Sequence, residues 1–288
     1  MRLLALALTL AASGCAAPAF LGNTGRVTPK GDFRVGVGTA YQVNTQAADI
    51  VKDGRDAAET LRARTTACPG GTGDCWTVAD VEPVVDAAFR FALVAPLSTS
   101  TMISGRYGFA PGFDGGLRWG SGGYGADLAW QPFGPRDAST PGLAGTLIVG
   151  YGKRSMGTLG DVIKDVFRGE AGLTDWSAAF VLGRQWKEFA HTYAAARYTL
   201  TSWTLTVIPD LPIIYDAAEV QQRLLGTDGS GSIHTTGGAL GGALGYKHVF
   251  VGAELNFLWT AGNARLLGRD RDLGSFGLMP ALYLYGQF

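Results

Sequence analysis

The chain has 288 residues, with 24 basic and 24 acidic side chains, and its charged fraction of 17% is low for a soluble domain. Because the charges balance, the sequence lacks the basic footprint of a nucleic-acid-binding protein, and no nucleic-acid partner is expected. Glycine is about twice as common as usual, with 43 residues, which without a collagen-like period indicates either low complexity or closely packed backbones.

The first 14 residues have the pattern of a secretory signal peptide. Arg2 is followed by an apolar run from Leu3 to Ala12 that is too short to span a bilayer as a helix, and small residues precede Cys15. The stretch Ala12–Gly14 resembles a lipobox, the site at which bacterial lipoproteins are cleaved and acylated on cysteine. Ala12 stands where the lipobox usually has leucine, so cleavage nearby without acylation is an alternative. The resemblance implies lipidation of Cys15, a lipidated segment over 15–30 and, since Ala16 is not aspartate, sorting to the outer membrane.

Residues 31–43 begin the body of the chain, and they alternate with a period of two. Phe33, Val35 and Val37 fall on one face of an extended strand, whereas Arg34 and the small or polar residues between them fall on the other. The same alternation recurs along the chain, separated by turns. It predicts strands at 31–43, 83–95, 99–109, 114–121, 123–133, 143–153, 174–186, 189–206, 235–247, 249–260 and 274–288.

Segments of about ten alternating residues are typical of a transmembrane β-barrel, but a soluble β-sandwich also alternates. The polar face of a sandwich meets water, where Lys, Glu, Ser and Thr are expected. Here that face is rich in Gly and Ala, which favours a crowded lumen. The sequence therefore predicts an all-β fold: an antiparallel transmembrane β-barrel over 31–288.

The sequence is compatible with two strand counts for this barrel. Single-chain bacterial barrels close with an even number of strands, yet eleven segments are predicted. One of the pieces within 83–133 is therefore misassigned, and we expect twelve strands, with ten as the alternative. Four long inserts should lie on the extracellular side, namely 44–82, 154–173, 207–234 and 261–273, and tight turns near Glu188 and His248 on the periplasmic side.

The inserts contain short amphipathic segments. Residues 47–65, 160–169 and 216–226 are predicted as helices that cover the extracellular mouth, with a disordered surface loop as the alternative. Cys68 and Cys75 in the first insert are separated by a turn-forming stretch, so a disulfide is predicted in an oxidising compartment. A metal site would need more ligands than two thiols, and neither a metal nor a cofactor is expected.

His234 is the histidine best placed for catalysis. In "SGSIHTTGG" it shares one strand face with Ser232 and Thr236, which a His-activated hydroxyl could use for lipid hydrolysis. The stretch lacks the Ser and Asn that barrel phospholipases carry after their histidine. The chain is therefore predicted not to be an enzyme, with an outer-membrane lipid hydrolase as a secondary alternative.

The chain resembles the small outer-membrane β-barrel proteins of diderm bacteria. The resemblance rests on the lipobox-like Cys15, on Gly-rich alternating strands such as "ISGRYGFAPGFDGGLRWGSGGYGADLAWQPF" and on the terminal Phe288. A final phenylalanine after alternating apolar residues resembles the assembly signal of such barrels, although Gly286 stands where a larger residue is usual. The resemblance implies residence in the bacterial outer membrane and, as partners, membrane lipid, the barrel-assembly and lipoprotein-sorting machinery and envelope proteins.

The polar strand faces predict a charge network in the lumen. Because both signs occur in nearly equal number, ion pairs across the lumen are expected rather than a strongly ion-selective pore. The favoured function is a structural or interaction platform in the envelope, and a narrow, weakly selective diffusion channel is the alternative. The predicted network comprises Asp32, Arg34, Asp86, Arg90, Arg106, Asp114, Arg118, Asp127, Arg197, Lys247 and Glu254.

Overall fold

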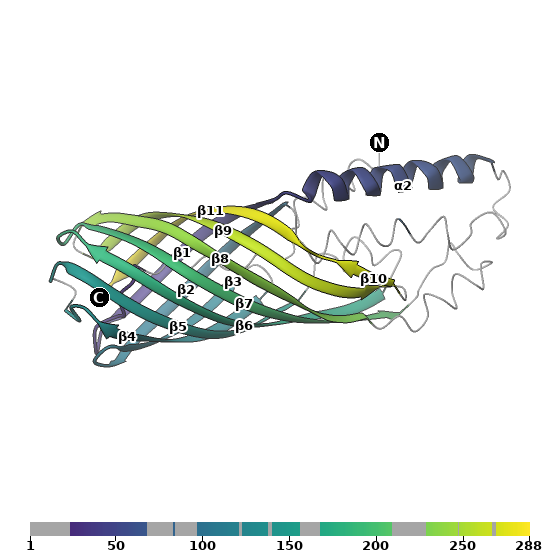
Figure 1. The fold of residues 1–288 in the computed structure, drawn as a ribbon. Coiled ribbons are helices and arrows are strands. Elements are labelled where there is room, and N and C mark those ends of the chain that lie inside the picture. The colour runs from purple at the N-terminus through teal and green to yellow at the C-terminus, as the bar shows by residue number, and fades with distance from the viewer. Residues whose placement is uncertain are drawn as a thin grey trace.

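A computed structural model shows a closed, antiparallel barrel of ten strands (Figure 1). It describes residues 24–67, 83, 97–120, 123–137, 140–155, 168–208, 229–246, 248–266 and 269–288. Each wall strand is hydrogen-bonded to its neighbour in sequence, and β9 returns through β11 to β1. The wall strands are β1 (Phe33–Asn44), β2 (Leu97–Ala110), β3 (Phe113–Gly120), β4 (Gly123–Phe133), β5 (Gly142–Ser155), β6 (Arg168–Gln185), β7 (Ala190–Ile208), β8 (Gly229–Tyr246), β9 (Val249–Leu266) and β11 (Ser275–Gln287).

The expectation of twelve strands is wrong, and the alternative of ten is confirmed. One edge of β1 pairs with β2 from Phe33↔Tyr107 to Val43↔Leu97, and the other edge pairs with β11. No further wall strand can therefore stand between β1 and β2. The predicted strand 83–95 lies, apart from Pro83, outside the described residues. The short β10 (Arg269–Asp272) extends the far end of β9.

The two faces of the wall differ as the alternation predicts. On β1, Phe33 and Val35 are about half exposed, at 55% and 51%, whereas Arg34 is 6% exposed and Ala40 2%. The apolar face thus points outward, and the small and polar face points into the lumen. A closed barrel leaves no strand edge unpaired, so its backbone can cross lipid with every hydrogen bond satisfied.

Exposed aromatic side chains gather toward two levels of the outer wall. Between the two levels the outer face carries mainly valine, leucine and alanine, together with Phe180, as in the lipid-facing band of membrane barrels. The lower girdle contains Phe33, Tyr107, Phe109, Trp130, Phe133, Trp186, Phe189, Tyr246 and Phe288, and the upper girdle contains Tyr41, Trp119, Tyr124, Trp176, Tyr198 and Trp259. Because membrane barrels have short periplasmic turns, the lower girdle marks the periplasmic side.

Four strands continue beyond the upper girdle on one side of the barrel. The strands β6 to β9 have 18 or 19 residues each, and their outward side chains beyond this girdle include Ser202, Thr204, Ser230 and Asn263. Parts of the predicted loops 154–173, 207–234 and 261–273 are therefore strand. The alternation of apolar and polar residues disappears there because the outer face leaves the lipid and becomes polar.

The predicted helix over 47–65 is present as α2 (Ala47–Ala67), at the same end of the molecule as the strand extensions (Figure 1). Ile50 and Ala57, seven positions apart and so on one helix face, are buried, while Lys52, Asp53 and Arg55 are exposed. Among the described residues, no helix has both the length and the apolar character needed to cross a membrane.

Several predicted features lie outside the described residues. These are the signal peptide over 1–14, the lipidation site Cys15, the cysteines Cys68 and Cys75, and the helix over 216–226. Most of the helix predicted over 160–169 also lies there, and its last two residues belong to β6.

Candidate functional site

The periplasmic end of the lumen is crossed by residues 24–30, here called the N-terminal strap. The Val27 amide donates to Gln131 Oε1 of β4 at 3.1 Å, and the Thr28 amide donates to Asp114 Oδ2 of β3 at 2.6 Å. On the far side, Thr146 of β5 donates to the Gly25 carbonyl at 2.7 Å. The strap thus has side-chain partners on three neighbouring strands, which pair the amides of Val27 and Thr28 and the carbonyl of Gly25.

Packing and charge also hold the strap. A Cβ atom at Gly183 of β6 would collide with the Thr24 carbonyl, so glycine is what lets the strap approach this strand. The Arg26 guanidinium donates to the carbonyls of Asp137 and Gly142, each at 3.1 Å. Burial lowers the pKa of Arg26, and the nearby Asp137 opposes that shift. From its sequence, this segment is predicted only to carry a lipid anchor.

Directly above the strap, an ion cluster joins β2, β3 and β4. Arg106 lies 2.5 Å from Asp114 and 2.6 Å from Asp127, and all three side chains are nearly buried, at 11%, 0% and 3% exposed. Arg118 approaches the same Asp127 at 3.4 Å. Since Asp114 also accepts the Thr28 amide, the cluster connects the barrel wall to the strap.

Arg34 does not form the ion pair that its sequence neighbour Asp32 suggests. Its guanidinium donates to Gln287 Oε1 at 3.0 Å and to the Arg26 carbonyl at 3.4 Å, and it lies 5.4 Å from the ring centre of Tyr285. Asp32 precedes β1 at the rim, where it is partly exposed.

On the opposite side of the lumen, polar and aromatic side chains of β7, β9 and β11 form a layer. Tyr193 of β7 donates to Glu254 of β9 at 2.5 Å, and Tyr283 of β11 donates to Tyr193 at 3.3 Å. Phe250 and Tyr285 stack beside them at 4.9 Å between ring centres. These bulky side chains occupy space that an open pore would need.

Nearer the extracellular end, a second ion pair joins β5 and β6. Arg154 contacts both carboxylate oxygens of Asp175, at 2.6 and 2.7 Å, and Thr201 of β7 donates to Asp175 at 2.7 Å. The sequence reasoning missed both charged residues. The predicted strand ended at residue 153, one residue before Arg154. Asp175, however, alternates with the outward Trp176, so its inward direction could have been inferred.

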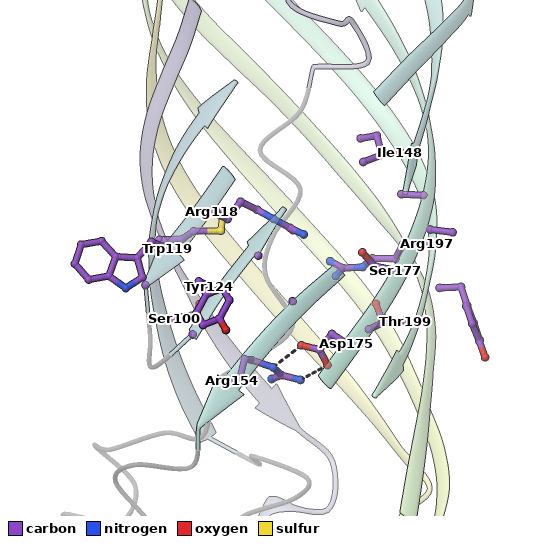
Figure 2. Close-up of a pocket in the computed structure, with 18 of the residues that line it drawn as sticks. Ser100, Arg118, Trp119, Tyr124, Ile148, Arg154, Asp175, Ser177, Arg197 and Thr199 are labelled. Carbon is purple, nitrogen blue, oxygen red and sulfur yellow. Dashed lines mark hydrogen bonds and ion pairs between the residues drawn. The ribbon is translucent and has the colours of Figure 1, made fainter. Parts of the chain in front are cut away.

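Beside this pair lies a cavity of about 100 Å³ in the lumen (Figure 2). Arg118 from β3 and Arg197 from β7 enter it from opposite walls, and Arg154 and Asp175 border it. Arg197 donates to Asn256 Oδ1 at 3.3 Å. Of the arginines around the cavity, Arg118 therefore also belongs to the cluster with Asp127 and Arg154 to the pair with Asp175, whereas Arg197 donates to a neutral amide.

The structure places most of the predicted charge network inward. The residues with inward side chains are Arg34, Arg106, Asp114, Arg118, Asp127, Arg197 and Glu254. Asp86, Arg90 and Lys247 lie outside the described residues. Phe288 is exposed at the periplasmic rim, stacked 5.7 Å from the ring of His248, and Gly286 leaves room for its ring.

His234 lies on the outer face of β8, just above the upper girdle. Its Nδ1 is 2.7 Å from the hydroxyl of Tyr198, which belongs to that girdle. Ser232 and Thr236 lie on the same outer face, as predicted, but the hydrogen bond of His234 is made with the tyrosine. Within the described ranges, no cluster of three or more His, Cys, Asp or Glu side chains could hold a metal ion.

No family model and no curated protein matches the chain. Solved structures similar to it include Ail, the attachment invasion locus protein of Yersinia pestis (8% identity, 90% of this chain, 99% of that chain, TM-score 0.31) and the Neisserial surface protein NspA (9%, 90%, 100%, 0.35). A third is the outer membrane protein OprG of Pseudomonas aeruginosa (13%, 91%, 98%, 0.28).

Membrane barrels of this kind occur in the outer membranes of bacteria. The ten-stranded wall closes without a free edge, its outer face is apolar, and two aromatic girdles bound that face. The chain is an integral β-barrel protein of the bacterial outer membrane.

Proposed function

We propose that the protein is a closed platform in the outer membrane rather than a diffusion channel. The observation that carries this proposal is the N-terminal strap across the periplasmic end of the lumen. Its buried hydrogen bonds to Gln131 and Asp114 leave no loose segment there that could move aside without breaking them. The Tyr193–Glu254 layer above the strap supports the same proposal.

The extracellular end of the barrel supports the proposal that the protein binds partner proteins. The extended strands β6 to β9 and the helix α2 present polar side chains beyond the upper girdle. The extensions of β6 to β9, which stand above the membrane on one side of the barrel, offer a surface for envelope proteins or other extracellular partners. The proposed partners of the protein within the envelope are outer-membrane lipid, the barrel-assembly machinery and the lipoprotein-sorting machinery. The assembly machinery would recognise Phe288, and the sorting machinery would act on an acylated Cys15.

The proposal includes the absence of enzymatic activity. His234 could act only at the level of lipid head groups, since it lies just above the upper girdle, and its hydrogen bond is made with Tyr198. An assay for fatty-acid release from phospholipid by the purified protein would detect hydrolysis. Hydrolysis that His234→Ala abolishes would show that the protein is a lipid hydrolase and would overturn this part of the proposal.

Planar-bilayer conductance tests the closed lumen. The unmodified protein should show negligible steady conductance, because the strap and the Tyr193 layer block the passage at two levels. A variant that lacks residues 24–28 and carries Tyr193→Ala, so that both levels are opened, should conduct more, whereas Gly105→Ala should not, since a Cβ atom there meets nothing within 4 Å. A large steady conductance of the unmodified protein would show a diffusion channel and overturn the proposal.

A further inference from the structure

We propose that the lumen cavity between β3 and β7 is a binding site for one small oxyanion of the phosphate or sulfate class. The proposal does not depend on whether the barrel conducts, because it concerns equilibrium binding to a cavity whose walls are formed by strands.

The lining of the cavity has an excess of positive charge. It contains three arginines, Arg118, Arg154 and Arg197, and one acidic residue, Asp175. Asp175 already accepts from Arg154 and from Thr201, so its oxygens are engaged away from the other two arginines. The carboxylate nearest to Arg118 is Asp127, which it approaches at 3.4 Å and shares with Arg106.

Arg197 has the weakest compensation of the three. Its hydrogen bond goes to a neutral amide, Asn256 Oδ1, at 3.3 Å, although a guanidinium has five N–H donors. The carboxylates of Glu254 and Asp175 favour this buried cation, and the guanidinium of Arg118 opposes it. An anion between Arg197 and Arg118 would offset the repulsion between these two guanidinium groups, and Figure 2 shows the two side chains directed toward one another across the cavity.

Neutral donors complete the site. Ser100, Ser177 and Thr199 contribute hydroxyl groups to the lining. Gly150 of β5 makes room for two of the cavity's donors, since a Cβ atom there would lie 2.8 Å from Ser177 Oγ and 3.1 Å from Arg118 Nη2. Guanidinium and hydroxyl groups around one space are the set that binds phosphate and sulfate oxygens.

The size and the position of the cavity limit the ligand. The cavity of about 100 Å³ is large enough to hold one tetrahedral oxyanion. The lining includes Gly120 and Gly123, the residues at the upper end of the β3–β4 hairpin, whose strands are the shortest of the wall. The ligand therefore enters from the extracellular side, and the strap lies below it.

Calorimetric titration of the purified, folded protein in detergent tests the site, with inorganic phosphate and sulfate as probes against chloride at matched ionic strength. Phosphate or sulfate should bind with one site per chain. Arg197→Gln should weaken this binding roughly tenfold or more, because it removes a charged donor, while Arg197→Lys should retain part of it. The matched control is Arg184→Gln, whose side chain packs on Trp186 at the outer periplasmic rim.

Two results would overturn the proposal. One is the absence of phosphate and sulfate binding to the unmodified protein up to about 10 mM, with no rise in its unfolding temperature relative to chloride. The other is equal binding by Arg197→Gln and the unmodified protein. If Arg197→Gln does not fold, Arg118→Gln replaces it, and the anion-dependent unfolding temperature of the unmodified protein decides by itself.

Discussion

At the scale of single residues, the lumen combines charges with glycines that make room for them. Arg106 serves two carboxylates at once, and one of these, Asp114, also accepts the Thr28 amide of the strap. A buried ion cluster of this kind adds little compared with an apolar core, but it becomes very unfavourable when one member is removed. The stability of the periplasmic half of the lumen is therefore expected to be sensitive to the loss of Arg106.

Arg106→Ala should lower the free energy of unfolding by about 3–5 kcal/mol, because it leaves the buried carboxylate of Asp114 without a cation and that of Asp127 with Arg118 alone. The measurement is urea unfolding in detergent, followed by the gel mobility difference between folded and unfolded barrel. Arg55→Ala is the control: its pair with Glu59 on α2 is solvent-exposed, and no measurable change is expected. Equal unfolding midpoints for Arg106→Ala and the unmodified protein would show that the cluster does not stabilise the barrel.

The direction of each lumen residue could be predicted wherever a strand alternates. Arg106, Asp127 and Glu254 followed from period two alone. The partner of each charge could not be predicted, because partners lie on other strands and depend on register and shear. Arg34 shows this: Asp32 is two positions away in sequence, yet Arg34 bonds to Gln287, at the other end of the chain.

At the scale of elements, the long strands cross two environments. On β7 the outward residues change from Ala194 and Ala196 to Tyr198 and then to Ser202 and Thr204. This order places the first pair in lipid, the tyrosine at the interface and the last pair in water. The strand itself continues because its backbone pairs with β6 and β8 over its whole length.

Cysteine scanning in intact cells tests this division. Ser202→Cys should react with a membrane-impermeant maleimide, because its side chain lies in water on the extracellular side. Leu182→Cys, on the lipid-facing part of β6, should not react until the membrane is dissolved. Peptide mass spectrometry separates these sites from the native cysteines. Labelling of Leu182→Cys alone would mean that the orientation or the membrane level is wrong.

Neither the strap nor the strand extensions could be predicted from the sequence, because neither has an alternating apolar face. The segment "TGRVTPKG" has the composition of a linker, and its burial depends on hydrogen-bond partners that β3, β4 and β5 contribute. The strand ends beyond the girdle have no apolar face, so hydrophobic periodicity gives no signal there. The eleventh predicted segment arose in the opposite way, from an alternating stretch at 83–95 that has no place between β1 and β2, and the requirement for an even number then left ten or twelve strands.

At the scale of the whole molecule, the barrel closes where its first and last strands meet. Phe33 and Phe288 exchange two backbone hydrogen bonds, at 2.7 and 2.8 Å, and β1 and β11 remain paired toward the extracellular end up to Asn44↔Gly277. The side chain of Phe288 contributes little to this closure, since it is 67% exposed and stacks on His248 at the rim. Its exposure leaves it accessible to another protein during assembly.

Deletion of Phe288 separates its roles in folding and in assembly. We expect the deletion to reduce the heat-modifiable, folded fraction of the protein in cells, because the proposed assembly signal is lost. The same variant, refolded in detergent, should still form a heat-modifiable barrel, since the pairs from Arg34↔Gln287 to Asn44↔Gly277 remain. Phe288→Tyr, which keeps an aromatic ring, should assemble like the unmodified protein. If the deletion impairs refolding in detergent as strongly as it impairs assembly in cells, Phe288 acts through barrel stability and not as a signal.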